Sequence, residues 1–253
     1  MNNFVKYARY YNLLYKDKDY EGEVNYVDRL IKRFTDKRNT TLLDIGCGTG
    51  NHDILFAKKG YRVVGIDRAG EMIAIARNRM VAGDRVEFCV SDISELILHR
   101  KFDIAISLFH VMSYLTTNEL FIKSLRNISK HLKKGSLFVF DFWYGPAVLT
   151  QRPARRTKNI TYESINIKRK AIPEINFNEN TVDIEYKITV LNKNSGLTEI
   201  IKENHKMRYF FLPELDFMLR QSGFKIIKSF KWLSTSDALS PTSWSGVVVA
   251  KRE

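Results

Sequence analysis

The chain is poor in cysteine: among 253 residues it has only Cys47 and Cys89. This excludes a disulfide framework and a cysteine-rich metal site, so no metal site is expected. The chain also lacks the run of about 18 apolar residues that a membrane-spanning helix requires. Its opening sequence, MNNFVKYARYY, lacks the apolar run of a signal peptide. We therefore expect a cytoplasmic protein with no membrane contact.

Internal repeats and low-complexity segments are absent as well. Hydrophobic residues make up 44% of the chain and charged residues 27%, which is ordinary for a soluble protein with a packed core and excludes wholesale disorder. The length fits one large domain, or a core with an elaborated insertion, better than two independent domains.

Acidic residues are fewer than basic ones: the chain has 28 Asp and Glu residues and 41 Lys and Arg residues, which gives a net charge of +13. Such a chain attracts anions: nucleic acid, acidic lipid or phosphorylated small molecules. Between positions 151 and 172, Glu163 is the only acid, and it faces seven basic residues: Arg152, Arg155, Arg156, Lys158, Lys168, Arg169 and Lys170. This stretch is either a solvated basic surface or an anion-binding segment.

The first half of the chain alternates short apolar runs with helical patterns. Expected strands are Thr41–Ile45, Arg62–Ile66, Val86–Val90, Ile104–Leu108 and Ser136–Phe140, and expected helices are Asn51–Lys59, Ala69–Met80 and Thr117–Leu132. We expect the last helix to end at Lys133-Lys134-Gly135. An amphipathic helical region from Phe4 to Phe34 precedes them. Strands that alternate with helices predict βαβ units and a parallel sheet.

The pattern changes after Asp141 to one typical of antiparallel strands, expected at Asn159–Lys170, Thr181–Leu191 and Thr198–Phe211. A helix from Pro213 to Leu219 and two closing strands, Phe224–Phe230 and Gly246–Ala250, follow. We thus predict an N-terminal helical cap over the cofactor (1–39), a cofactor-binding α/β core (40–148), an antiparallel β insertion over the substrate (149–211) and a closing part of the core (212–253).

Three expected strand ends carry ligand-binding residues. The first strand leads into Asp44-Ile45-Gly46-Cys47-Gly48-Thr49-Gly50, the second ends at Asp67 and the third at Ser91-Asp92. Glycine lets the backbone approach a ligand closely, and an acid after the second strand can accept the hydroxyls of a ribose. The third glycine falls one residue too early for a dinucleotide site, and Asp44 suits a cationic ligand better than a pyrophosphate.

These motifs, within residues 40–142, resemble motifs I, II and III of the class I S-adenosylmethionine-dependent methyltransferases. The resemblance implies a Rossmann-like fold with a mostly parallel seven-stranded sheet, an antiparallel closing strand and an antiparallel β insertion that covers the active site. It implies S-adenosylmethionine as the cofactor. The implied binding residues are Tyr11, Tyr20, Asp44, Gly46, Gly48, Gly50, Asp67, Arg68, Asp92, Ile93 and Leu108.

Further segments resemble small methyltransferases that modify sugars and nucleotide-linked amino sugars, some of them found with capsule and O-antigen biosynthesis. These segments are Tyr10-Tyr11-Asn12-Leu13, Ser107-Leu108-Phe109-His110, Asp141-Phe142-Trp143 and His205-Lys206-Met207-Arg208-Tyr209. The implied activity is methylation of a sugar hydroxyl, with N-methylation of an amino sugar or another small amine as the alternative. Tyr114 stands where the amino-sugar enzymes can carry histidine, so the acceptor chemistry does not transfer directly.

The candidates for a catalytic base are His110, Asp141 and His205. A hydroxyl acceptor needs such a base, whereas an amine needs little more than positioning. Tyr114, Trp143 and Tyr144 are expected pocket walls. We expect Arg152, Arg155 and Arg156 to bind phosphate groups of the acceptor, because they follow the ligand-binding edge of the sheet and their planar forks suit a diphosphate.

The expected partner is therefore a phosphorylated or nucleotide-linked sugar, and a homodimer is the other partner considered. An RNA methyltransferase is a weaker alternative, because the Asn/Asp-Pro-Pro-aromatic motif of base amino methylation is missing after the fourth strand, where the chain reads Leu108-Phe109-His110-Val111. Neither cysteine lies where cytosine C5 methylation needs a nucleophile. A non-catalytic binding module is the remaining alternative.

Overall fold

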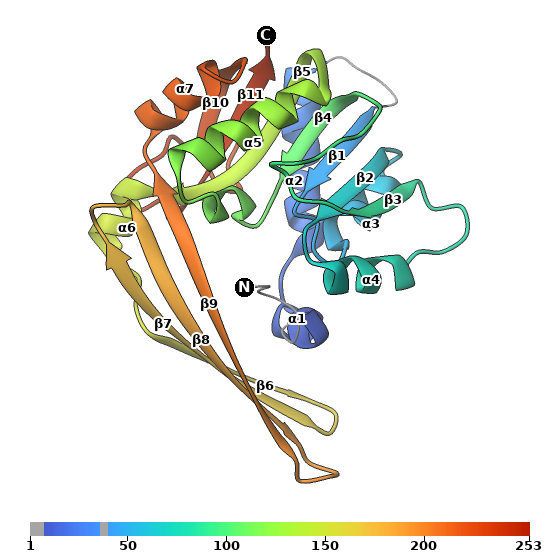
Figure 1. The fold of residues 1–253 in the computed structure, drawn as a ribbon, viewed down its shortest axis with the longest axis vertical. Helices are drawn as coiled ribbons and strands as arrows, with labels where there is room; N and C mark the ends of the chain where they lie inside the picture. The colour runs from blue at the N-terminus through green and yellow to red at the C-terminus, as the bar shows by residue number, and fades with distance from the viewer. Residues whose placement is uncertain (1–7, 36–39) are drawn as a thin grey trace.

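The computed structural model describes residues 8–35 and 40–253, and its centre is a twisted sheet (Figure 1). The parallel strands β1 (Thr41–Ile45), β2 (Arg62–Asp67), β3 (Val86–Val90), β4 (Phe102–Ser107) and β5 (Leu132–Tyr144) lie in the order β3-β2-β1-β4-β5. Beyond β5, β11 (Ser245–Arg252) pairs antiparallel with both β5 and β10 (Phe224–Lys231). This confirms the predicted mostly parallel sheet with an antiparallel closing strand.

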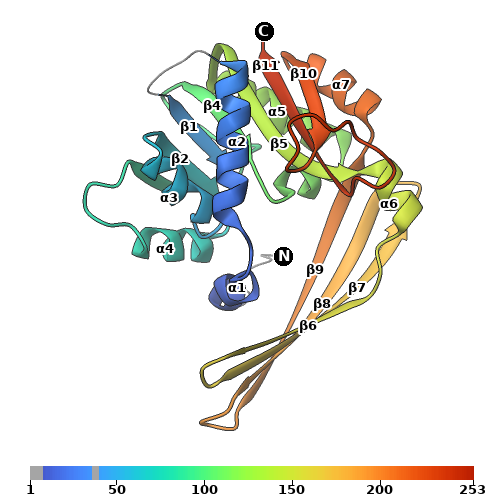
Figure 2. The same ribbon diagram turned by 180° about the vertical axis from the view of Figure 1, so that it is seen from behind.

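Helices cover both faces of the sheet, because successive strand residues point to opposite sides. On one face, Leu43 and Val64 pack in a cluster with residues of α5 (Asn118–Lys130) and α7 (Leu212–Arg220). On the other face, Leu42 and Val63 pack with residues of α2 (Tyr20–Phe34), α3 (Asn51–Lys58) and α4 (Gly70–Asn78). Figure 2 shows α2 running across this second face. The result is a three-layer α/β core.

Local signals set the starts of two of these helices. The Asp19 side chain accepts a hydrogen bond of 2.8 Å from the Gly22 N–H at the start of α2. Thr117 accepts one of 3.2 Å from the Leu120 N–H at the start of α5. Such side chains satisfy N–H groups that have no partner within the helix.

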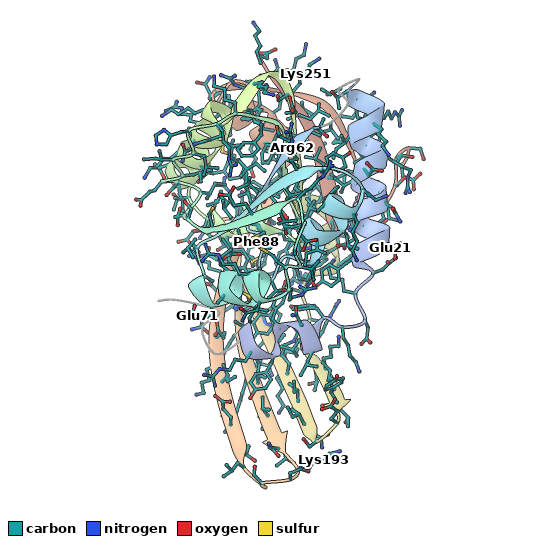
Figure 3. The ribbon with its side chains drawn as sticks, turned by 90° about the vertical axis from the view of Figure 1, so that its right-hand side faces the viewer. Glu21, Arg62, Glu71, Phe88, Lys193 and Lys251 are labelled. Atoms are coloured by element: carbon teal, nitrogen blue, oxygen red, sulfur yellow. The ribbon has the colours of Figure 1, made fainter. Side chains whose placement is uncertain are left out.

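Four long antiparallel strands form an arm that projects from the core (Figures 1 and 2). We call β6 (Arg156–Tyr162), β7 (Ile165–Asn176), β8 (Thr181–Asn192) and β9 (Thr198–Phe210) the arm. Its base is tied to the core where Trp143 and Tyr144 of β5 pair with Tyr209 and Phe210 of β9. Figure 3 shows Lys193 at the far tip.

The inner face of the arm packs against the helix α1 (Ala8–Leu14). Ile160, Ile167 and Ile188 of the arm share an apolar cluster with Ala8 and Leu14 of that helix, and Met72 of α4 belongs to the same cluster. Figure 1 shows α1 between the core and the arm.

Several expected elements differ from those observed. The expected strand Asn159–Lys170 is a hairpin of β6 and β7, turned at Glu163, which has a φ of 48°. Lys133-Lys134-Gly135 belongs to the start of β5 rather than to a helix end, because α5 already ends at Lys130 and Leu132 pairs with Phe102 of β4. The short helices η1 (Val111–Tyr114) and α6 (Gly145–Gln151) were not predicted.

Residues 4–7 of the expected amphipathic region, and the rest of 1–7 and 36–39 in the expected cap, lie outside the described residues. Within 8–35 and 40–253, no helix is long and apolar enough to span a membrane.

Candidate active site

A cavity of about 430 Å³ lies at the carboxyl ends of the parallel strands, the place where open α/β sheets bind ligands. The residues that line it come from the N-terminal segment, from the edge of the sheet and from the arm. Tyr11 and Tyr15 come from α1 and the residues after it, Asp67 ends β2, and Ile184 belongs to the arm. The cavity therefore forms only when the core, α1 and the arm are together.

The glycine loop after β1 forms one wall, through Gly46 and Gly48. Both have left-handed backbones, with φ angles of 76° and 57°. A Cβ atom on Gly46 would lie 2.4 Å from a methyl group of Val111, whereas one on Gly48 would meet nothing within 4 Å. Gly48 thus leaves the backbone open toward the cavity, where a ligand can approach it.

Gly50 does not line the cavity, contrary to expectation. Its φ is 75°, and a Cβ atom there would lie 2.5 Å from the ring of Phe88. The third glycine of the motif therefore allows α3 to pack closely on β3. Its contribution to the cofactor site is through the shape of the loop.

Asp67 lies at the cavity wall with its carboxylate fixed by the backbone. Its two oxygens accept hydrogen bonds from the Gly48 N–H, at 2.9 Å, and the Ala69 N–H, at 2.8 Å. Burial raises the pKa of Asp67 from its ordinary value. A carboxylate oxygen accepts more than one hydrogen bond, so this fixed group can also take hydroxyl donors from a ribose.

The other expected cofactor residues after β2, β3 and β4 also meet at this wall: Arg68, Asp92, Ile93 and Leu108. Asp92 accepts a hydrogen bond of 2.8 Å from the Ser94 N–H, which orients its carboxylate. The structure brings these residues together because the carboxyl ends of neighbouring parallel strands lie side by side.

Asp44 is the second expected cofactor residue that does not line the cavity. Its side chain is 1% exposed and lies beside that of Asp53, which is fully buried. Burial first, and then the neighbouring carboxyl, raise the pKa of Asp44 well above its ordinary value. The two acids therefore form a buried pair beneath the glycine loop, and neither of them lines the cavity.

Tyr11 and Tyr20 close the cavity from the N-terminal side, as expected. Burial raises the pKa of Tyr20 to about 12. Its ring lies edge-on to His52, 5.0 Å between centroids, and His52 Nε2 is 2.8 Å from Glu23 Oε2. Tyr15, His52 and Phe109 also line the wall and were missed. The aromatic spacing around Tyr11 could have indicated Tyr15, but nothing local marked His52.

The cavity wall fits S-adenosylmethionine. The open backbone at Gly48, the fixed carboxylate of Asp67 and the tyrosines above them match a ligand with a ribose and a cationic methionine end. In residues 8–35 and 40–253, no group of three or more His, Cys, Asp or Glu side chains is placed to hold a metal ion.

His110 and Asp141, two separate candidates in the sequence, form one unit. Asp141 Oδ1 accepts a 2.9 Å hydrogen bond from the His110 N–H, and Asp141 Oδ2 lies 2.8 Å from His110 Nδ1. His110 lines the cavity, with Nε2 3.5 Å from Ser245 Oγ. Asp141 is 1% exposed and does not line it. Asp141 is therefore placed to orient His110 and not to contact the acceptor.

The backbone around His110 is strained. Phe109 and His110 both take left-handed conformations, with φ angles of 68° and 63°, which are uncommon for residues other than glycine. Such strain persists only where surrounding contacts hold it, and it concentrates at functional sites. Here it turns the His110 side chain toward Asp141 at the edge of the cavity.

The opposite wall of the cavity belongs partly to the arm. His205 of β9 lines it, and its Nδ1 lies 2.7 Å from the Tyr114 hydroxyl of η1. Trp143 and Trp244 also line the wall and pack on each other, 5.6 Å between ring centroids. Tyr144, the third expected pocket wall, instead packs against the apolar core. Alternation along β5 turns it away from Trp143.

The three expected phosphate-binding arginines lie away from the cavity. Arg152, Arg155 and Arg156 are exposed, and none of them lines it. Arg152 follows α6, with its guanidinium 6.0 Å from the ring of Phe177. The helix α6, which the sequence did not reveal, carries the chain away from the sheet edge before the arginines begin.

Comparisons with known proteins agree with this geometry. The family described as "Methyltransferase domain" matches residues 42–135. A dTDP-3-amino-3,4,6-trideoxy-alpha-D-glucopyranose N,N-dimethyltransferase of Streptomyces venezuelae is 30% identical over 144 residues, which are 56% of this chain and 59% of that relative's length. The chain thus spans less than two thirds of this relative.

Solved structures share the whole fold. A S-adenosylmethionine-dependent methyltransferase from Clostridium acetobutylicum has a TM-score of 0.81 at 21% identity, covering 98% of both chains. The amino pentose methyltransferase CalS10 from Micromonospora echinaspora, solved with S-adenosylmethionine bound, has a TM-score of 0.76 at 24% identity and covers 96% of both. Residues 42–135 therefore match a methyltransferase domain, and the chain as a whole has the fold of the S-adenosylmethionine-dependent methyltransferases, among them an amino-sugar enzyme.

Proposed function

We propose that this chain is an enzyme that transfers a methyl group from S-adenosylmethionine to the amino group of a nucleotide-linked amino sugar. The observation that carries the proposal is that Asp67, His110 and residues of the arm line one and the same cavity. A cofactor bound at Asp67 and an acceptor beside His110 would therefore meet there. The similarity to a dTDP-amino-sugar N,N-dimethyltransferase supports the class of acceptor. We place the amine before the hydroxyl that the sequence alone favoured, because of this relative.

The cofactor supplies an electrophilic methyl group on a sulfonium. The chain orients the two reactants, which is the main source of acceleration for an in-line displacement. His110 Nε2 is placed to accept the proton that the acceptor nitrogen loses when its new bond to carbon forms and the carbon–sulfur bond breaks. Asp141 holds the other side of the ring and stabilises the positive charge that the ring then carries.

A sugar hydroxyl is the second candidate acceptor, and the His110–Asp141 pair is the observation that favours it. A hydroxyl is a poor nucleophile until a base removes its proton. A histidine oriented by a buried carboxylate is an arrangement that performs this task in other enzymes. The same pair also serves an amine, so the acceptor must be identified directly.

The deciding experiment compares matched acceptors. Purified protein is incubated with S-adenosylmethionine and either a dTDP-linked amino sugar or the corresponding hydroxy sugar, and the products are analysed by mass spectrometry. Gain of one or two methyl groups on the amino sugar alone supports the proposal. Methylation of the hydroxy sugar supports the second candidate. Binding of S-adenosylhomocysteine without any methylation, across a panel of nucleotide-linked sugars, would contradict both.

A role in surface polysaccharide synthesis, a cytoplasmic location and a homodimer stay predictions.

A further inference from the structure

The basic segment of the arm is divided between two faces of β7. Lys168 and Lys170 are exposed on the outer face, whereas Arg169 between them is half-buried on the inner face. This follows from the alternation of side chains along a strand. Of this three-residue basic run, only Arg169 therefore points toward α1 and the cavity.

Arg169 lies between two tyrosines of the cavity wall. Its Nη1 donates a 2.9 Å hydrogen bond to the Tyr15 hydroxyl. Its guanidinium carbon is 5.4 Å from the centre of the Tyr15 ring and 5.3 Å from that of Tyr186, and both tyrosines line the cavity. Contacts with two aromatic rings and a hydroxyl hold a guanidinium in a defined orientation. Arg169 is thus a fixed cation at the rim.

The position of Arg169 relates to the acceptor side of the cavity. The ring of Tyr186 lies edge-on to that of His205, 5.0 Å between centroids, and Arg169 lies on the other side of Tyr186. These three residues therefore follow one another along the arm, from His205 in the cavity wall outward to Arg169. Asp67 and Asp92, in contrast, belong to the core side. An acceptor that places its reactive atom inside the cavity can extend its distal end along the arm to Arg169.

A second cation lies next to Arg169. Lys158 of β6 is its direct partner in the strand register. Lys158 Nζ donates a 2.7 Å hydrogen bond to the Leu14 carbonyl and lies 3.8 Å from Asp17 Oδ2. Lys158 and Arg169 therefore place two cations side by side where the arm faces α1.

We propose that Arg169 binds a phosphate group of the acceptor, in the diphosphate of a nucleotide-linked sugar. The identity of the acceptor rests on the proposed function, but the anion-binding role does not. A guanidinium presents a planar fork of N–H donors that matches phosphate oxygens, which a lysine in the same place does not reproduce. Arg169 would thus select acceptors that carry phosphate, while the cavity behind it selects the sugar.

The kinetic test compares substitutions on the two faces of β7. Arg169→Gln should raise the KM for the dTDP-linked acceptor by about 10- to 100-fold, the usual effect of losing a charge-assisted hydrogen bond. Lys168→Gln and Lys170→Gln remove the same charge from the same strand and should leave KM within about twofold. Arg169→Lys, which retains the charge without the fork, should lie between. An Arg169→Gln variant that matches the two lysine controls would overturn the proposal.

A binding test separates this proposal from the proposed function. In the presence of S-adenosylhomocysteine, calorimetry measures binding of dTDP, thymidine and a sugar 1-phosphate to the wild type and to Arg169→Gln. The substitution should weaken the binding of dTDP and leave the affinities for thymidine and S-adenosylhomocysteine unchanged, even if no sugar is methylated. If the substitution weakens the binding of the sugar 1-phosphate as much as that of dTDP, a single phosphate group is sufficient for recognition by Arg169. Equal loss of S-adenosylhomocysteine binding indicates a structural role and contradicts the inference.

Discussion

The hydroxyl of Tyr114 lies 2.7 Å from Nδ1 of His205, although the two residues are 91 positions apart. Tyr114 ends η1 in the core, and His205 belongs to β9 of the arm. Desolvation raises the pKa of Tyr114 well above its ordinary value, so its hydroxyl keeps the proton at neutral pH. This contact joins the core and the arm across the cavity.

Tyr114→Phe removes that hydroxyl and keeps the ring. We expect the KM for the acceptor to rise by about three- to tenfold, the usual effect of one neutral hydrogen bond, with unchanged affinity for S-adenosylhomocysteine. Steady-state kinetics and calorimetry measure the two quantities. Tyr162→Phe, on an exposed residue of the arm, is the matched control. If both variants behave like the wild type, the contact has no role in acceptor binding.

Asp67→Ala removes the carboxylate that two backbone N–H groups orient toward the cavity. We expect binding of S-adenosylhomocysteine to weaken by about 1–3 kcal/mol, or about ten- to hundredfold, on calorimetry. Asp183→Ala, on the exposed outer face of the arm, should leave the affinity unchanged. An unaltered affinity in Asp67→Ala would contradict the assignment of the cofactor site.

On a hydroxyl acceptor, His110→Ala should lower kcat by more than about tenfold, because it removes the proton acceptor, whereas on an amine acceptor the loss should be smaller. Asp141→Asn should lower kcat as well, since its amide cannot stabilise the charged imidazole that Asp141 Oδ2 contacts at 2.8 Å. Both variants should bind S-adenosylhomocysteine normally. A kcat within tenfold of the wild type in both variants, on the true acceptor, rules out general-base catalysis by this pair.

Alanine at Gly48 and at Gly46 should have different effects. At Gly48 the new methyl group meets no protein atom within 4 Å, so folding should lose only about 1 kcal/mol for the left-handed backbone, while cofactor affinity falls. At Gly46 the methyl group would collide with Val111 at 2.4 Å, so stability should fall further. Urea unfolding and calorimetry separate the two effects. Equal cofactor affinity in Gly48→Ala and the wild type would show that the loop is not in contact with the ligand.

The buried pair of Asp44 and Asp53 should make stability depend on pH. Burial raises the pKa of Asp53 to about 7, whereas an aspartate in the unfolded chain titrates near 3.9. The folded state therefore holds a proton that the unfolded state has released, and the free energy of unfolding falls as pH rises from about 4 to about 7. Asp53→Asn should make this slope shallower and stabilise the protein at about pH 8, measured by urea unfolding.

Asp103 supplies the opposite control for that experiment. Burial raises its pKa, but the bonds from Lys133 and Thr41 outweigh this effect and lower the pKa to about 2. Its contribution to stability is present above the unfolded pKa of about 4 and is lost as pH falls toward 2. Asp103→Asn should therefore destabilise the protein at neutral pH. The same response to pH in both variants would contradict the assignment of a raised pKa to the Asp44–Asp53 pair.

The sequence by itself determined the core sheet and the cofactor wall. Asp67 ends β2 and Asp92 follows the end of the neighbouring parallel strand β3, and strands of one sheet bring their carboxyl ends to a common edge whatever the details of packing. The apolar runs and the helical patterns between them are local signals, so they predicted which segments form strands and which form helices. The antiparallel arm was predicted for the same reason, from its alternation of apolar and polar residues.

Only the tertiary structure decided how single side chains combine. His110 and Asp141 form a pair because β4 and β5 are neighbours and two left-handed residues turn the chain between β4 and η1. Asp44 lies beneath the glycine loop because α3 brings Asp53 against it. Arg169 points inward and Arg152 away because the turn at Glu163 and the helix α6 set the direction of the chain. A strand pattern gives a period of two, but which face is the inner one depends on where each turn falls and on what packs against it.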